Sequence, residues 1–106
     1  NYRFTPTTAG KYNVFINMSM ETTGGVSTLN NVFVRLHKNG STIHQSYIDN
    51  SNNNGFAALG VVTAIVDMNG SSDYLEAFVR PTASSGNVTV LGVTYTMFGA
   101  FKLIGV

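Results

Sequence analysis

The sequence predicts an all-β fold, an antiparallel β-sandwich or jelly roll. Seven or so short segments have the character of strands, and turns rich in Gly, Asn and Ser join them at even spacing. No stretch carries an amphipathic helical pattern, and no repeat of fixed period indicates a propeller or a solenoid. A chain of 106 residues, 43% of them hydrophobic, suits one domain with a small core.

The clearest predicted strand runs from Tyr12 to Met20. Every second residue in this stretch is apolar, polar residues take most of the alternate positions, and only Phe15 breaks the alternation. This is the period of a half-buried strand. Pro6 and Gly10 precede this strand and predict a tight turn before it. Proline fixes its own φ, and glycine tolerates backbone angles that other residues avoid.

Residues Glu21–Ser27 are predicted to form a turn, and Thr28–His37 the next strand. Asn39-Gly40 then follows between two alternating segments. This pair is the strongest short hairpin signal, because both residues accept the positive φ of a type I′ turn. We therefore expect Thr42–Ile48 to return as the partner strand.

Residues Asp49–Gly55 are too polar for a core and predict an exposed loop. The segment Phe56–Met68 is nearly continuous in apolar character, which predicts a strand buried on both faces. A short buried helix is the alternative, but the β-branched residues and flanking turns favour a strand. Gly60 would mark a bulge or a close approach of another segment.

The last part of the chain predicts one turn, one large loop and three strands. The turn is Asn69–Asp73 and the loop is Pro81–Asn87. The strands are Tyr74–Arg80, Val88–Leu91 and Tyr95–Val106.

Composition narrows the possible partners. The net charge is +1 and the six basic residues are scattered, which argues against a nucleic-acid partner. Only 10% of residues are charged, against ~25% in an average soluble protein, so the surface suits sugars and other uncharged partners. There is no Cys, hence no disulfide framework or thiolate metal site, and no apolar run long enough for membrane insertion. The start at Asn1, without Met, is interpreted as the C-terminal part of a longer chain.

The residues that could support catalysis or metal binding form no convincing set. The carboxylates are Glu21, Asp49, Asp67, Asp73 and Glu76. No two of them are expected to face each other as a glycosidase requires, and no Ser–His–acid set is evident. The Asp49–Asn54 segment has a single carboxylate, a poor calcium loop. His37 and His44 flank the predicted hairpin and could approach each other on neighbouring strands, but two exposed polar side chains are the expectation. We predict no enzyme, no metal and no cofactor.

Four segments, in order, resemble one known family. They are Phe4–Met20, Val34–Ile43, Asp73–Val79 and Thr94–Ile104. Their turn before a Tyr-led strand, Asn-Gly hairpin, short strand after an Asp and aromatic C-terminal strand resemble the globular head domain of complement first-component subcomponent q, a tumour-necrosis-factor-like jelly roll. The resemblance covers most of Phe4–Leu103. It implies a single jelly-roll head domain over residues 1–106 that forms a homotrimer around an apolar three-fold axis.

The low charge and absent Cys are more similar to the bacterial and viral versions of this head. Those sit at the tips of bacteriophage fibres, on phage capsids, or on bacterial collagen-like spore-surface proteins. The resemblance therefore implies a non-enzymatic structural or binding head of a virion protein, a tail fibre tip or a capsid fibre or decoration, which presents loops for attachment to a host surface. The expected location is the virion surface, or alternatively a secreted, bacterial cell-surface or spore-surface position.

Two sets of residues are the candidates for these roles. The apolar surplus of the C-terminal strand, of Phe56–Val66 and of the Met18/Met20 pair predicts that one face of these strands forms a trimer axis. The predicted trimer contacts are Tyr95, Met97, Phe98, Phe101 and Leu103. Loops on a rigid scaffold are the usual place for recognition. The candidates for binding a host-surface glycan or protein are Asp49, Asn50, Asn52, Asn53, Asn54, Thr82, Ser84 and Ser85.

Two other readings of the role stay open. The first is a purely structural trimerisation or capsid-decoration knob without a receptor. The second is a small polysaccharide-binding or hydrolysing module, with Tyr47, Tyr74 and Tyr95 as candidates for a stacking platform.

Overall fold

The computed structural model describes residues 2–22, 29–50, 55–92 and 94–105. The strands in these ranges are β1 (Gly10–Thr22), β2 (Leu29–Lys38), β3 (Ser41–Asp49), β4 (Ala57–Met68), β5 (Leu75–Ala83), β6 (Val88–Val90) and β7 (Met97–Lys102). The described residues contain no helix, and so none that is long and apolar enough to cross a membrane.

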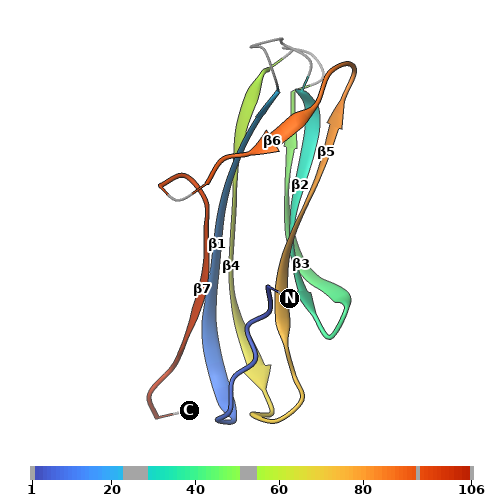
Figure 1. Ribbon diagram of the computed structural model, residues 1–106. Helices are drawn as coiled ribbons and strands as arrows, with labels where there is room; N and C mark the ends of the chain where they lie inside the picture. The colour runs from blue at the N-terminus through green and yellow to red at the C-terminus, as the bar shows by residue number, and fades with distance from the viewer. Residues whose placement is uncertain (1, 23–28, 51–54, 93, 106) are drawn as a thin grey trace.

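The strands form two antiparallel sheets that face each other (Figure 1). In the first, called here the β1 sheet, β4 pairs with one side of β1, while β7 and β6 pair in succession with the other side. In the second, the β2 sheet, β2 lies between β3 and β5. The all-β, sandwich-like architecture predicted from the sequence is thus confirmed.

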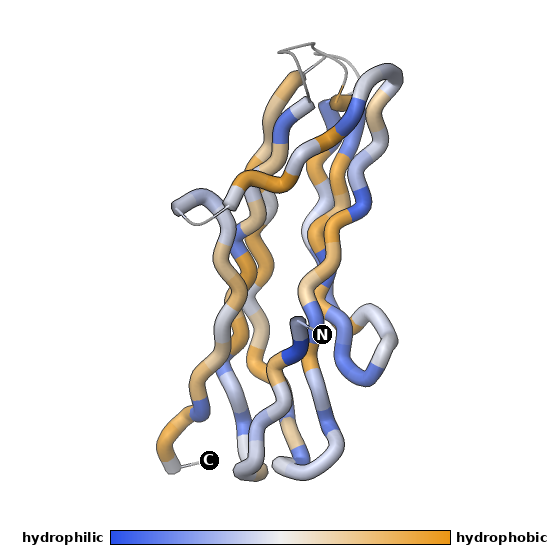
Figure 2. Tube along the Cα trace, viewed as in Figure 1, coloured by the Kyte–Doolittle hydropathy of each residue, from blue (hydrophilic) through white to orange (hydrophobic). Residues whose placement is uncertain are grey.

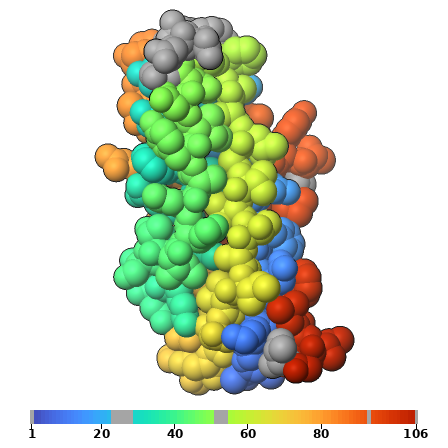
Figure 3. Space-filling view, turned by 180° about the vertical axis from the view of Figure 1, so that it is seen from behind, coloured from blue at the N-terminus to red at the C-terminus, as the bar shows by residue number. Residues whose placement is uncertain are grey.

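The sandwich is elongated, with extents of 47 × 24 × 22 Å, and its two sides are closed differently. Seen from behind, β3 and β4 lie side by side along the molecule (Figure 3). On the other side the N-terminal segment lies between the sheets near one end (Figure 1). Phe4 of this segment exchanges backbone hydrogen bonds with Leu75, and its ring packs 5.6 Å from the ring of Tyr12.

The core is built from the inward-facing residues of both sheets. The predicted alternation of β1 is confirmed, because alternate residues from Tyr12 to Met20 are buried. The fully buried side chains are Val14, Ile16, Met20, Leu29, Val32, Val34, Leu36 and Leu75. Figure 2 shows hydrophobic residues recurring along the strands of both sheets. Fully burying one such aliphatic side chain contributes about 1.5–3 kcal/mol.

Gly60 marks a close approach of the two sheets. It is a buried residue of β4, and a Cβ there would overlap Val34 Cγ2 of the β2 sheet. The register between β1 and β4 continues through this position without a shift. Of the two sequence-based interpretations of this glycine, the structure therefore supports the close approach.

The predicted Asn-Gly hairpin is confirmed, with φ of 53° at Asn39 and 85° at Gly40. The Asn39 side chain also ties this turn to the one between β4 and β5. Its Oδ1 accepts a hydrogen bond from Tyr74 N–H at 3.0 Å, and its Nδ2 donates to Asp73 Oδ1 at 2.9 Å. Asp73 Oδ2 accepts from Asn69 N–H at 2.9 Å and lies 3.2 Å from Lys38 Nζ. One end of the sandwich is thus joined by a polar network.

Most strand boundaries differ from the prediction by one or two residues, and those of β5 and β7 differ by more. β5 extends to Ala83, although Pro81 suggested that it ends at Arg80. Leu75 uses its backbone groups on the outer side of β5, towards Phe4, and Pro81 lies at the same parity in an unbroken register with β2. The missing N–H of Pro81 therefore removes no hydrogen bond to β2, which is how an edge strand tolerates proline. The C-terminal strand is shorter than expected and covers only Met97–Lys102.

The expectation that the Phe56–Met68 strand is buried on both faces is wrong. β4 alternates, with one face in the core and the other exposed at Leu59, Val61 and Ile65. A continuously apolar strand is buried on both faces only when another layer of the structure covers its second face.

Replacing Gly60 by Ala is expected to lower the free energy of unfolding by about 1–3 kcal/mol, because the added methyl group forces Val34 out of its place. Urea unfolding with an unchanged m-value would measure the loss. Gly92→Ala is the matched control, since a Cβ there meets nothing within 4 Å. An equal loss in both variants would contradict the close approach.

The polar network predicts a pH-dependent stability. The hydrogen bond from Asn39, followed by those from Asn69 and Lys38, holds the pKa of Asp73 below its ordinary value. A lowered folded-state pKa contributes stability above the ordinary pKa of aspartate, ~3.9, and this contribution is lost as pH falls through the folded-state pKa. Urea unfolding between neutral pH and about pH 3 should show that Asp73→Asn is less stable than the wild type at neutral pH. Its free energy of unfolding should also fall less steeply than that of the wild type as the solution is acidified.

Asp67→Asn is the control for that experiment, because its carboxylate is 75% exposed and pairs with Lys11 only at the surface. A wild-type pH profile retained by Asp73→Asn would contradict the role of the network.

Candidate functional site

Two of the loops predicted to bind a host surface begin at the same end of the sandwich. Asp49 closes β3 and Thr82 lies near the end of β5. Both are register partners of Asn31 in β2, so the three residues form one row across the end of the β2 sheet. This end lies opposite the polar network of the Asn39 turn (Figure 1).

The other predicted loop residues are only partly described. Asn50 follows β3, and its N–H donates to the carbonyl of Asn30 at 2.6 Å. Ser84 and Ser85 follow β5 and are exposed, and both have interaction partners. The predicted binding residues Asn52, Asn53 and Asn54, and most of the Glu21–Ser27 turn, lie outside the described residues.

The outer face of the β1 sheet is strongly apolar, and we call it the apolar face. Its apolar members are Phe15 of β1, Leu59, Val61 and Ile65 of β4, and Met97 and Phe101 of β7. Asn13, Asn17, Thr63 and the Lys11–Asp67 ion pair share the same face. The register places Ile65 and Phe101 on either side of Asn13, and Val61 and Met97 on either side of Asn17. Ile65 is 63% exposed and Phe101 is 55% exposed. Apolar residues from three neighbouring strands therefore share one exposed surface.

Phe15 and Gly99 make the centre of the apolar face flat. The two residues are register partners, and a Cβ on Gly99 would lie 2.5 Å from Cζ of the Phe15 ring. Only glycine lets this ring lie across β7. Phe15, the one break in the predicted alternation of β1, thus has its place on this face.

The structure divides the five predicted trimer-contact residues. Met97 and Phe101 lie on the apolar face. Phe98 lies on the opposite side of β7, where it is the register partner of Ile16 and packs against the core. Tyr95 is exposed in the segment before β7, and Leu103, just beyond β7, is half-buried.

The sequence placed one face of Phe56–Val66 among the expected trimer contacts, and the structure shows which residues of β4 are exposed there. Met18 and Met20, which were expected to contribute as well, are buried in the core instead. Leu59, Val61 and Ile65 are exposed because their alternate neighbours, including Gly60 and Val62, point inward. The close approach expected at Gly60 could have identified these exposed residues. A strand residue that faces the other sheet places its two immediate neighbours on the outer face.

A small, mostly apolar pocket of about 280 Å³ opens between the N-terminal segment and β7. It is lined by Tyr2, Arg3, Phe4, Phe98 and Gly99. Arg3, the charged residue among these, is paired with Glu76 at 3.2 Å. The pocket therefore presents surface for packing and no set of reactive groups.

The titratable side chains that might have formed a reactive centre are dispersed. Lys11 pairs with Asp67 at 2.8 Å on the β1 sheet. His37 opposes Thr42, whereas His44 opposes Leu36 and lies on the other face of the β2 sheet, so the two imidazoles do not converge. The described residues contain no group of three or more His, Asp or Glu side chains that could hold a metal ion.

Comparison with known proteins adds no further assignment. No protein-family model matches the chain, and no curated protein matches it. The functional argument therefore rests on the surfaces of the sandwich.

Proposed function

We propose that this chain is the head domain of a non-enzymatic, trimeric virion protein, a fibre tip or capsid fibre, which attaches to a host surface through loops at one end. The observation that carries the proposal is the apolar face. Monomeric soluble proteins rarely expose contiguous apolar patches larger than a few hundred Å². In this proposal, two further copies of the chain cover the apolar face.

A jelly-roll topology of the complement-head type is part of the proposal. It is supported by the strand order, with β1 between β4 and β7 in one sheet and β2 between β3 and β5 in the other. The chain crosses from sheet to sheet after β1, β3, β4 and β5. Repeated crossing between two sheets is typical of jelly rolls.

A three-fold arrangement is favoured over other closed assemblies by the resemblance of the sequence to complement-type heads. The geometry is compatible with it, since the strands β4, β1 and β7 run along the long axis of the sandwich (Figure 1). Burying this face against its copies removes Ile65, Phe101 and their neighbours from water, as in an obligate interface.

Attachment by the loops is supported by their position. The row Asp49, Asn31 and Thr82 and the exposed Ser84 and Ser85 lie at one end of the molecule, clear of the apolar face. Loops held by a rigid scaffold are the usual site of recognition. In a trimer built around the apolar face, three copies of this end would point the same way.

Ile65→Lys should convert the trimer to soluble monomers or aggregates, because three lysines buried at one axis repel each other and lose their hydration. Light scattering after size exclusion, at several concentrations, measures the mass. Ile43→Lys is the control, since Ile43 is an isoleucine that is 44% exposed on β3 of the other sheet, away from the apolar face. Trimers that survive Ile65→Lys, or a wild-type monomer, would refute the assembly.

Loop attachment predicts that Thr82→Arg together with Ser85→Arg reduces binding of the labelled domain to a panel of bacterial cells by at least about tenfold, a loss of about 1.4 kcal/mol. Bulky side chains would block close contact without touching the core. Ser41→Arg, at the other end of β3, is the control. A domain that forms trimers but binds no cell would instead indicate a structural knob without a receptor.

A further inference from the structure

The outer face of the β2 sheet carries a second patterned surface, which we call the arginine–aromatic face. Its central members are Phe33, Arg35 and His37 of β2, Gln45 and Tyr47 of β3, and Phe78 and Arg80 of β5. The same face also carries Glu76, which pairs with Arg3, at one end and the row Asp49, Asn31 and Thr82 at the other. The sequence has three arginines, and Arg35 and Arg80 are both on this face while Arg3 stands at its edge. Each of the three lysines lies elsewhere.

The register arranges this face in rows. Tyr47, Phe33 and Arg80 form one row across the three strands. Gln45, Arg35 and Phe78 form the next. Each arginine therefore has an aromatic ring as its neighbour across the sheet and along its own strand.

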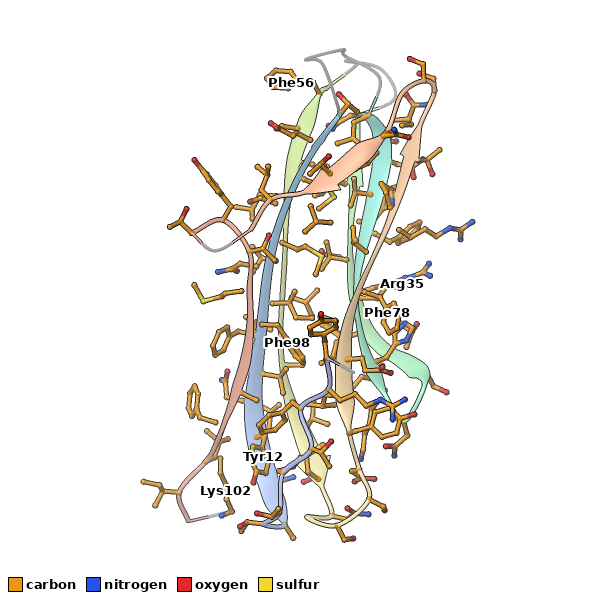
Figure 4. All side chains as sticks on the ribbon, in the orientation of Figure 1. Tyr12, Arg35, Phe56, Phe78, Phe98 and Lys102 are labelled. Atoms are coloured by element: carbon orange, nitrogen blue, oxygen red, sulfur yellow. The ribbon has the colours of Figure 1, made fainter. Side chains whose placement is uncertain are left out.

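The contacts within the rows are close. The rings of Phe33 and Tyr47 lie 4.6 Å apart, and Arg35 Cζ lies 4.6 Å from the centre of the Phe33 ring. Arg35 Nε donates to Gln45 Oε1 at 3.0 Å, which holds the guanidinium group in place. His37 stacks on Phe78 at 4.3 Å. Figure 4 shows Arg35 and Phe78 directed away from the interior of the sandwich.

The face still presents unused recognition groups. Tyr47 is 52% exposed and Phe78 is 44% exposed, so each ring offers surface to a ligand. The ion pairs of the described residues involve Arg3, Lys11 and Lys38, but neither Arg35 nor Arg80. Two guanidinium groups thus stand on this face without a carboxylate partner in the part of the chain that the structure describes.

We infer that this face binds an acidic polysaccharide, with sugar rings stacked on Tyr47 and Phe78 and sugar carboxylates held by Arg35 and Arg80. Guanidinium groups match carboxylates as planar, bidentate donors, and aromatic rings supply flat apolar contact. Tyr47 and Phe78 lie two strands and one row apart, about 12 Å, a distance that a short oligosaccharide spans. The ligand must therefore combine flat apolar surfaces, which match the exposed aromatic rings, with carboxylates, which match the two guanidinium groups.

Other occupants fit this surface less well. A nucleic acid requires several basic residues along one backbone, and this face has only two arginines outside the ion pairs of the described residues, in a chain of net charge +1. A further copy of the chain suits the apolar face, where Lys11 and Asp67 are paired with each other. Cross-strand contacts account for Phe33 with Tyr47 and for Arg35 with Gln45, but not for two guanidinium groups that pair with no carboxylate of the described residues.

This inference rests on the proposed attachment role and deepens it by naming a ligand class, but it uses a different surface. The arginine–aromatic face lies on the sheet opposite the apolar face, so it stays accessible when the apolar face is covered. Thr82 lies on this face one row beyond Arg80, whereas Ser85 lies in the loop after β5. The two proposals can therefore fail separately.

The test is calorimetric titration of the 106-residue chain, as it assembles, with oligosaccharides of polygalacturonate, alginate, hyaluronan and polysialic acid. Carboxyl-reduced galacturonate oligosaccharides are the matched neutral probe. We expect at least one acidic probe to bind and the reduced probe to bind at least about tenfold more weakly, since hydrogen bonds to charged groups are lost. Absence of binding by all four acidic probes overturns the inference.

Variants locate the site. Arg35→Gln and Arg80→Gln are each expected to reduce affinity about tenfold or more, and Phe78→Ala by about tenfold. Arg35→Lys should also bind more weakly, because an ammonium group cannot form the bidentate contact. Lys102→Gln removes one positive charge from the β1 sheet and should leave binding unchanged. A loss in Lys102→Gln equal to that in Arg35→Gln would reduce the effect to net charge and overturn the inference.

Thermal unfolding of each variant shows whether the fold is retained, and Arg35→Lys keeps the inference testable if Phe78→Ala does not fold. The single variant Ser85→Arg separates the two proposals, because Ser85 lies beyond β5 whereas Thr82 is beside Arg80 on the arginine–aromatic face. Oligosaccharide binding that persists in Ser85→Arg while cell adsorption is lost supports both proposals. Cell adsorption that needs only the loops, with no acidic probe bound, removes this inference and leaves the proposed function.

Discussion

Strand β1 is the element on which the rest of the structure depends. Its inward residues Val14, Ile16 and Met20 are fully buried, and it pairs with β4 on one side and with β7 and β6 on the other. The side-chain period of two assigns these residues to the core and their neighbours to the outside. A shift of one residue in register would exchange the two faces, so the core and the apolar face are specified together.

The sandwich therefore has two outer faces of different chemistry. The β1 sheet exposes aliphatic and aromatic side chains around Phe15, and the β2 sheet exposes rings interleaved with Arg35 and Arg80. The first surface is suited to copies of the same chain, because it is mainly apolar and its Lys11 and Asp67 are paired with each other. The second retains water-exposed donors and suits a polar partner. Assembly and recognition can thus use opposite sides of one small core.

Much of the fold could be predicted, because strands and turns are local features. The alternation of β1 and the positive φ values at Asn39 and Gly40 follow from the chemistry of neighbouring residues. The expectations that the structure corrects concern which neighbouring strands surround a residue. Pro81 predicts the end of a strand, but it lies in an edge strand, on the side where its missing N–H removes no hydrogen bond to β2. Phe98 was grouped with Phe101, although one faces the core and the other is exposed.

The sequence by itself determined the all-β class, the positions of most strands and the hairpin, since each depends on periodicity or on a turn within a few residues. Only the tertiary structure decided which face of β4 is exposed, which residues join into the apolar face, and that Arg35 and Arg80 share a surface with Phe78. These placements depend on register between strands that lie far apart in the chain. No local pattern encodes which distant strand becomes a neighbour, because that choice is made by the packing of the whole core.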